Sequence, residues 1–476
     1  MPTRAISDKE EPGSTTNRKT GSASRLSPLT PQQGAQSTHW TAAARARPGG
    51  KAGSAALKAA AWLLTTLAWA LADTAAAQLP SPGDAAPREK DEERVEIDAD
   101  VEPAARDAAL PDRPLMLRAG ASFGWDSNIF RQPSAREERI RSGYIGLRVD
   151  KVYAQQRVRL DVTETAYRYH NFRHLDFNAL DYIGAWTWHL GPRIEGSLSA
   201  SRAESLADYS ELSNPGELNV RTTENFLASA DAWLFGGWHL VGGLSGVQDR
   251  YSVPTPHQGS YRADGVEAGA RWVAPSENWL AFKLRSLEGR YTDRALDPVA
   301  LIDDGFQRRE TEALAAWRFT GKSSLDARAA WIDYRSNHFA ERDFSGIAAR
   351  LRYLWAATAR ISLSVQFNRE MEPWQDDAAS HRVENRLTLG AAWQPAARTT
   401  LSVDASRAAS DFRDPVPGFT GTPRNDLEHR LQVQAEWRAL RKLSLNAAAQ
   451  RYRRSSSDPA ANYRGSQFTA GASLLF

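Results

Sequence analysis

The chain of 476 residues contains no cysteine. This absence excludes disulfide frameworks, metal sites built from thiolates and a cysteine nucleophile. A large excess of either sign of charge is lacking as well, because 60 Lys and Arg nearly balance 57 Asp and Glu. A net charge of +3 produces no strong positive field, so we expect no nucleic-acid partner. We also expect no cofactor and no bound metal.

Long hydrophobic runs are scarce. After residue 78 no stretch of roughly 18 uncharged apolar residues occurs, so we expect no transmembrane helix in the mature chain. The one apolar run, AAAWLLTTLAWALA at 59–72, follows Lys51 and Lys58 and precedes three alanines at 75–77. A positive flank, a short apolar stretch and a small-residue cleavage site predict a secretory signal peptide, with an uncleaved membrane anchor as the alternative.

These features predict three parts. Residues 1–77 are a long n-region followed by the signal peptide. Residues 78–113 are rich in Pro, Ala and acidic side chains, and we expect them to be disordered in the periplasm. Residues 114–476 form one folded domain, since a regular alternation of apolar and polar residues begins there and continues to the end.

The folded part is dominated by apolar and polar residues in strict alternation. In Leu427–Trp437 one set of positions reads Leu, His, Leu, Val, Ala, Trp, and the other reads Glu, Arg, Gln, Gln, Glu. Val383–Trp393 has the same pattern, with Val383 and Leu387 on the apolar side. Alternation of this length predicts strands of about ten residues or more, with one apolar and one charged face. Strands of soluble domains average about five or six residues.

Connections of two kinds alternate along the domain. Longer polar loops, such as 206–220, 293–306 and 411–424, lie between tight turns. The tight turns are 151–154, 191–193, 236–238, 274–278, 320–323, 356–359, 394–398 and 439–442. Eight turns and nine loops make seventeen connections, hence eighteen strands. We therefore predict an all-β fold, a transmembrane antiparallel up-and-down β-barrel of about 18 strands (16–18), of the kind found in bacterial outer membranes. A β-propeller with a tryptophan-bearing repeat is the alternative.

Aromatic residues mark one end of the predicted strands. A tryptophan precedes most of the tight turns, where amphipathic rings settle at the membrane interface. This predicted interface girdle is Trp188, Trp233, Trp272, Trp317, Trp355, Trp393 and Trp437. The chain ends SQFTAGASLLF, and its last strand places Phe468, Leu474 and Phe476 as an expected signal for the barrel-assembly machinery.

Charged residues on the other face of the strands would line the lumen. Near the bilayer midplane a charged side chain facing lipid costs about 2–4 kcal/mol, whereas an aqueous lumen solvates it. The predicted lumen-lining residues are Arg148, Arg157, Arg159, Asp161, Lys283, Arg285, Arg328, Arg350, Arg352, Glu384, Arg386, Glu428, Arg430 and Glu436. Guanidinium groups suit anionic or sugar-like solutes, but the interleaved acids argue against purely anionic selectivity.

Two local motifs contain residue types that occur in active sites. Residues 120–124 match G-x-S-x-G, which requires a strand-to-helix elbow, yet here they lie inside a predicted strand. His170 and His174 share a short loop without an accompanying carboxylate triad. We therefore predict no enzymatic activity, with a barrel hydrolase as the open alternative.

The first strand ends in GWDSNIFRQP, residues 124–133, and this stretch is similar to the EpsL-type proteins of exopolysaccharide operons that accompany exosortase systems. Its sharpest part contains Asp126, Asn128, Phe130 and Arg131. The resemblance implies an outer-membrane barrel that exports an exopolysaccharide together with periplasmic polysaccharide-export components. Asp126 and Asn128 also suit the turn from strand to loop, so a structural role for the motif stays open.

The sequence thus predicts a barrel among the lipids of a Gram-negative outer membrane, forming a channel for an exopolysaccharide. A general or solute-specific porin and an outer-membrane hydrolase are the alternatives.

Overall fold

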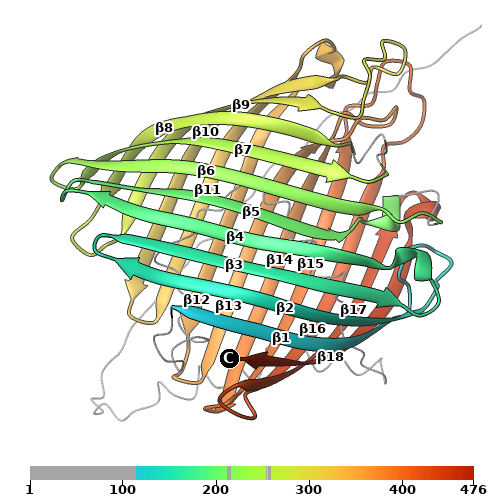
Figure 1. Ribbon diagram of the computed structural model, residues 1–476. Helices are drawn as coiled ribbons and strands as arrows, with labels where there is room; N and C mark the ends of the chain where they lie inside the picture. Colours follow the sequence, from blue (N-terminus) through green and yellow to red (C-terminus); the bar gives the residue numbers. More distant parts are fainter. Residues whose placement is uncertain (1–113, 212–215, 254, 256–258) are drawn as a thin grey trace, which may run out of the picture. The chain divides into compact units, whose positions relative to one another are not determined.

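The computed structural model describes residues 114–476, apart from 212–215, 254 and 256–258. The signal peptide and acidic segment predicted at 1–77 and 78–113 lie outside the described residues. The described residues form eighteen strands and four single-turn 3-10 helices (Figure 1). Among them, no helix is long and apolar enough to cross a membrane.

The strands are long and separated by connections of two kinds. Those on the first half of the chain are β1 (Leu115–Asp126), β2 (Glu138–Tyr153), β3 (Gln156–Tyr169), β4 (Phe177–Leu190), β5 (Ile194–Leu206), β6 (Val220–Phe235), β7 (Trp238–Tyr251), β8 (Tyr261–Val273) and β9 (Trp279–Tyr291). The others are β10 (Gly305–Thr320), β11 (Ser323–Ser336), β12 (Phe344–Ala356), β13 (Ile361–Pro373), β14 (His381–Ala396), β15 (Thr399–Arg413), β16 (Asn425–Trp437), β17 (Leu443–Ser456) and β18 (Tyr463–Leu475). The 3-10 helices η1 (Arg173–Leu175), η2 (Tyr209–Glu211), η3 (Ala340–Arg342) and η4 (Pro459–Ala461) lie in the longer loops.

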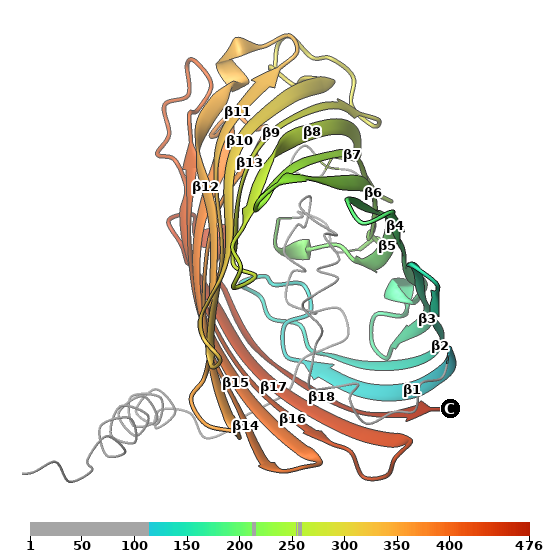
Figure 2. The same ribbon diagram turned by 90° about the vertical axis from the view of Figure 1, so that its left-hand side faces the viewer.

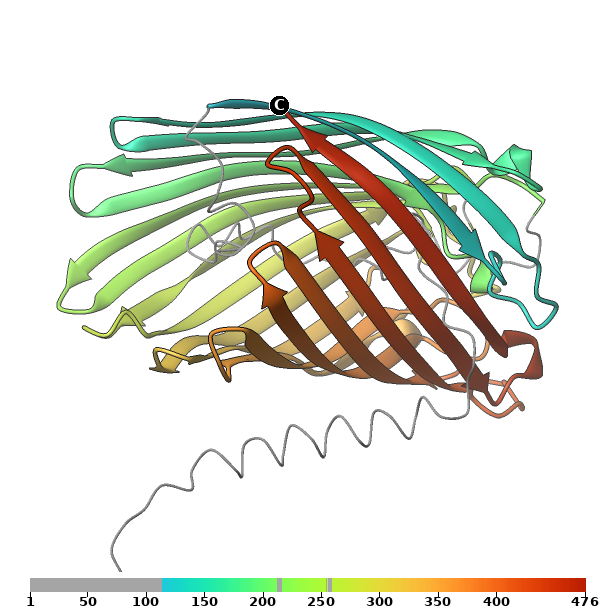
Figure 3. The ribbon, with the colours of Figure 1, turned by 90° about the horizontal axis from the view of Figure 1, so that it is seen from below.

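Every strand pairs antiparallel with its neighbours in the sequence, and β1 also pairs with β18. In that last pairing Trp125 lies opposite Phe468, and Arg118 lies opposite Leu475. Figure 3 shows the first and last strands side by side. The predicted 18-stranded closed barrel is therefore confirmed, and the propeller alternative is wrong.

Alternation along each strand separates an apolar outer face from a polar inner face. On β2, Ile145 is 66% exposed and points outward, as do Leu147 and Val149, whereas Arg148 points inward. An exposed apolar band on the outside of a closed barrel is the arrangement that a bilayer stabilises. The fold is thus a transmembrane barrel of the outer-membrane type.

The two ends of the barrel differ as predicted. Hairpins at one end turn within a few residues, and Gly191 and Gly236 adopt the positive φ angles that such turns require. By the rule for outer-membrane barrels, this end faces the periplasm and the end with the longer loops faces outward. Some strands are longer than predicted. The turn expected at 394–398 is confined to 397–398, because β14 continues through a bulge after Trp393 as far as Ala396.

The wall departs from a simple cylinder between β12 and β13. Their pairing ends at Ala349 opposite Arg369, whereas β13 and β14 stay paired out to Pro373 opposite His381. Beyond that point the outer face of β13 and β14 packs against the inner face of β12. The sulfur of Met371 lies over Gly346, where an added Cβ would come within 2.8 Å.

This overlap covers one residue of the predicted apolar outer face. Val383 was expected beside Leu387 on the exposed apolar face, but its exposed fraction is 0%. It belongs to an apolar core with Phe344 and Met371. His381, also on the outer face of β14, stacks on the Phe344 ring with centroids 4.5 Å apart. At its extracellular end the wall is therefore two layers thick here.

Candidate functional site

The predicted lumen-lining residues all lie on the inner face by the alternation of their strands. On β3, Val158 and Leu160 are exposed on the outside, so Arg157, Arg159 and Asp161 point inward. The same parity places the predicted charged residues of β2, β9, β11, β12, β14 and β16 inside the barrel. Their positions in the sequence did not reveal which residues form ion pairs with them.

Charges on the inner wall are cross-paired between strands. Asp150 of β2 accepts from Arg157 at 2.8 Å and lies 3.4 Å from Arg159. Asp161 forms an ion pair with Arg118 of β1, a partner that was not predicted from the sequence. Acid and base therefore alternate across β1, β2 and β3, so that this part of the wall offers both signs of charge to the lumen.

A second group of charges crosses β8 to β11. Glu310 is buried and contacts Arg328 at 2.8 Å, and Arg328 also binds Glu312 at 2.7 Å. Lys283 binds Glu267 at 2.7 Å. Buried charges require such partners, since an isolated one would carry a large desolvation penalty. The acids were missed at the sequence level because only their register against the basic residues shows the pairing.

A third group lies on β14 and β16. Arg386 contacts Glu384 at 2.8 Å and Glu428 at 3.7 Å, and Arg430 contacts Glu428 at 3.2 Å. The hydroxyl of Tyr463 donates to Glu428. The inner wall is thus hydrophilic and carries paired charges of both signs, which does not match a purely anionic preference.

The helix η2 of the loop between β5 and β6 lies inside the ring of strands (Figure 2). Its Tyr209 is 2% exposed and meets the Phe130 ring edge-on, with centroids 5.3 Å apart. Phe130 in turn meets Phe172 at 4.9 Å. These rings join an apolar core with Ile140 on the inner face of β2. Three loops are thereby packed together at the outer mouth.

Glu211 at the end of η2 reaches the opposite wall. Its carboxylate contacts Arg424, just before β16, at 2.7 Å, and Arg454 of β17 at 2.6 Å. Burial alone would raise the pKa of Glu211, but the two guanidinium groups outweigh it and lower this pKa to about 2. The loop is therefore tied across the outer mouth by a charged contact that persists at every ordinary pH.

The motif that begins at Asp126 is built into the closure of the barrel. The Asp126 carboxylate accepts from the backbone N–H of Asn128, from the hydroxyl of Tyr452 of β17 and from the side-chain amide of Gln467 of β18, each at 2.8 Å. Arg131 forms an ion pair with it, also at 2.8 Å. These contacts join the first loop to the last two strands.

The rest of the motif serves the same joint. Asn128 donates to the carbonyl oxygen of Arg464 at 3.1 Å, and the Arg131 guanidinium lies 4.0 Å from the centre of the Tyr452 ring. Phe130 is 1% exposed. The motif thus uses its side chains to hold the closure of the barrel and the packed loops.

Six of the seven girdle tryptophans occupy outward positions near the periplasmic rim, among them Trp355, Trp393 and Trp437, which are exposed. Trp233 is the exception. It lies opposite His239 and shares the inner face with Asp231, and its indole donates to Gly236 within the turn. The outward aromatic position of this hairpin is Trp238, opposite Trp272. Phe468 and Leu474 lie on the outer face of β18, and Phe476 is half exposed directly after it.

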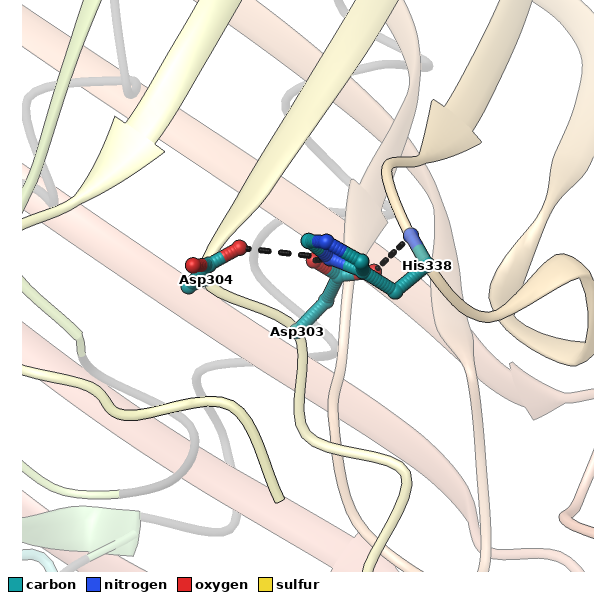
Figure 4. A group of neighbouring side chains, drawn as sticks. All are labelled: Asp303, Asp304 and His338. Carbon is teal, nitrogen blue, oxygen red and sulfur yellow. Dashed lines mark hydrogen bonds and ion pairs between the residues drawn. The ribbon is translucent and has the colours of Figure 1, made fainter. Parts of the chain in front are cut away.

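One group of side chains has the spacing of a metal site in the described part of the chain. Ligand atoms of Asp303, Asp304 and His338 lie within 4.8 Å of one another (Figure 4). However, Asp303 already accepts from the backbone amides of Gly305, His338 and Phe339, and His338 Nδ1 lies 3.1 Å from its carboxylate. The group therefore ties two extracellular loops together.

The G-x-S-x-G sequence lies within β1, and Ser122 exchanges a 2.7 Å hydrogen bond with Ser142 of β2. It is thus part of a regular strand and not a strand-to-helix elbow. The absence of enzymatic activity stays a prediction.

No family model matches the chain, and no curated protein matches it either. Solved outer-membrane proteins are similar in fold. OpdK of Pseudomonas aeruginosa, solved with vanillate, is 11% identical, with 76% of this chain and 99% of that chain covered and a TM-score of 0.44. OccK2 of the same organism, solved with glucuronate, is 12% identical over 77% and 99%, with a TM-score of 0.44. A BenF-like porin from Pseudomonas fluorescens is 12% identical over 77% and 100%, also at 0.44.

The strand pairing and the inner wall of this chain by themselves define its class, an outer-membrane, porin-like β-barrel. The resemblance to EpsL-type proteins stays a prediction.

Proposed function

We propose that the protein is an outer-membrane channel for small hydrophilic solutes. The observation that carries this proposal is the inner wall, where charged side chains from many strands face the lumen as pairs of opposite sign. Such pairs supply donors and acceptors that a passing solute can use in turn. Because the paired charges keep their partners in the wall, none of these pairs holds a solute strongly.

The outer mouth limits what can pass. Tyr209 and Glu211 fix η2 between one wall and the other, so a solute enters beside this helix and not along the full width of the barrel. Sugars, sugar acids and other compact polar molecules suit such an entry. Their hydroxyl and carboxylate groups can exchange hydrogen bonds with Arg and Glu side chains.

Planar-bilayer recording tests the proposal. Purified protein added to a bilayer should produce stepwise currents, with weak preference between cations and anions because the wall charges are paired. A barrel that inserts but carries no current would contradict an open channel. Strong anion selectivity would contradict the paired wall. Insertion is checked independently by the heat-dependent shift in electrophoretic mobility that folded barrels show.

Export of an exopolysaccharide is a second candidate, favoured by the motif at Asp126, Asn128, Phe130 and Arg131. In the structure these side chains bind protein groups, so the motif supports a shared architecture more than a contact with polymer. Deleting the gene distinguishes the two functions. Polymer trapped in the periplasm would favour export, whereas unchanged surface polymer with reduced uptake of small solutes would favour the solute channel.

A further inference from the structure

Six arginines lie on the outer wall beside the closure of the barrel, near the extracellular ends of four strands, β17, β18, β2 and β3; together with β1, which lies between β18 and β2, these make five adjoining strands. This arginine patch consists of Arg139, Arg141, Arg168, Arg451, Arg453 and Arg464, and all six are exposed. Their outward direction follows from the residues between them. Arg139 and Arg141 flank the buried Ile140, and Arg451 and Arg453 flank the buried Tyr452.

Within the patch, arginines are direct neighbours. Arg453 and Arg464 are cross-strand partners, and so are Arg141 and Arg168. Like charges directly opposite each other destabilise a sheet. None of the six forms an ion pair among the residues that the structure describes. Arg168 has neutral partners, the carbonyl oxygen of Phe177 and the side chain of Asn178.

Some outward arginines elsewhere on the barrel are neutralised by the protein. Arg262 pairs with Asp264 and Arg335 with Asp333, both at 3.2 Å. On the five strands of the patch, by contrast, Glu164 is the one acid on the described outer face. The repulsion in the patch therefore calls for an anion from outside the chain.

The position of the patch along the membrane normal indicates the source of that anion. Directly below it lies the apolar band, since Arg141 is the cross-strand partner of the exposed Phe123 and precedes Ile145 on its own strand. From Tyr153 at the periplasmic rim to Arg141 is about 40 Å along an extended strand, or about 30 Å across a bilayer at the usual tilt. The patch thus lies where the headgroups of the outer leaflet lie.

We propose that the arginine patch binds the phosphate groups of a phosphorylated glycolipid in the outer leaflet. The planar fork of a guanidinium group matches two phosphate oxygens at once. A phosphate between Arg453 and Arg464 would convert a repulsive pair into a bridged one. This inference rests on the barrel's position in the membrane and is independent of the solute that passes through the lumen.

Native mass spectrometry of the purified full chain in neutral detergent tests the proposal, with bisphosphorylated lipid A as the probe and dephosphorylated lipid A beside it. The wild type should retain the bisphosphorylated lipid, and R453Q with R464Q should weaken retention about thirtyfold. The matched control, R262Q with R335Q, removes two arginines that have acidic partners and should leave retention unchanged. Inorganic phosphate at equal concentration should not displace the lipid.

Equal retention by the R453Q/R464Q variant, or equal retention of the dephosphorylated lipid, would overturn the proposal. Folding is tested separately by thermal unfolding in lipid-free detergent. The R453Q/R464Q variant should unfold no earlier than the wild type, because it loses a repulsive pair. Earlier unfolding without lipid would show that these arginines stabilise the barrel itself, which would also overturn the proposal.

Discussion

Glu211 accepts a hydrogen bond from Arg454 at 2.6 Å although 243 residues separate them along the chain. This contact ties η2 to the far wall across the outer mouth. Replacing Glu211 by Gln removes the charge on η2 that Arg424 and Arg454 share, while both arginines keep their contact with Asp426. We expect this to weaken the contact across the mouth by about 2 kcal/mol. We expect single-channel recordings of E211Q to show a larger mean current with frequent fluctuations.

The matched control for this variant is E217Q. It removes the same charge from the same loop, but Glu217 is exposed. Its recordings should match the wild type. Currents of E211Q that cannot be told from those of E217Q would show that η2 does not narrow the mouth.

Acid should break the contact of Glu211 with Arg424 and Arg454 only at very low pH. The pKa of Glu211 is lowered from 4.5 to about 2, so its stabilising contact is fully present above pH 4.5 and is lost as the pH falls through about 2. Recordings at pH 7 and pH 5 should therefore agree, and the fluctuations of E211Q should appear in the wild type below about pH 3. A transition centred near pH 4.5 would mean that the two arginines do not hold Glu211.

Replacing Asp126, although it lies at the end of a strand, should clearly lower the free energy of unfolding. Asn at this position loses the charge that Arg131 needs, inside a site that also joins Tyr452 and Gln467. We expect D126N to lower the free energy of unfolding by about 3 kcal/mol. Denaturant titration of tryptophan fluorescence in detergent measures this difference.

The control for D126N is D264N, because Asp264 pairs with Arg262 on the exposed outer face. Surface ion pairs contribute at most about 1 kcal/mol. If the two variants lose equal stability, the motif does not hold the closure of the barrel.

The histidine in the loops that meet at Asp303, His338, should have a raised pKa. The Asp303 carboxylate beside its ring raises the pKa of His338 above the usual 6.5. The stabilising contribution of this contact is therefore full below pH 6.5 and is lost as the pH rises through the higher, folded-state pKa. NMR titration of the His338 ring should show a smaller shift in D303N, where Asp304 still lies 3.4 Å from the ring, and an unshifted wild-type ring would refute the contact.

Much of the fold could be predicted because a bilayer imposes a simple rule on each strand. The turns and loops between strands predicted their number and order, and alternation of apolar and polar residues predicted the inward direction of residues such as Arg386 and Glu428. The rule fails where something other than lipid covers the outer face. Val383 follows the alternation but is buried, because β13 and β14 pass inside β12.

The site was less predictable because its contacts join distant parts of the chain. Nothing near Glu211 in the sequence points to Arg424 or Arg454. Trp233 keeps the inward parity of Asp231, and the bulge of β6 comes only after it. The aspartate and arginine of the Asp126 motif were visible, but their partners on β17 and β18 depend on closure of the barrel.

Solute flux tests the central claim most directly. Liposomes loaded with an impermeant polymer and carrying the wild-type protein should swell in solutions of monosaccharides and of their acids at similar rates. The rate should fall steeply for oligosaccharides, because η2 narrows the mouth, and this size limit should relax in E211Q. Swelling no faster than in protein-free liposomes, for every solute and for both proteins, would contradict a channel for small hydrophilic solutes.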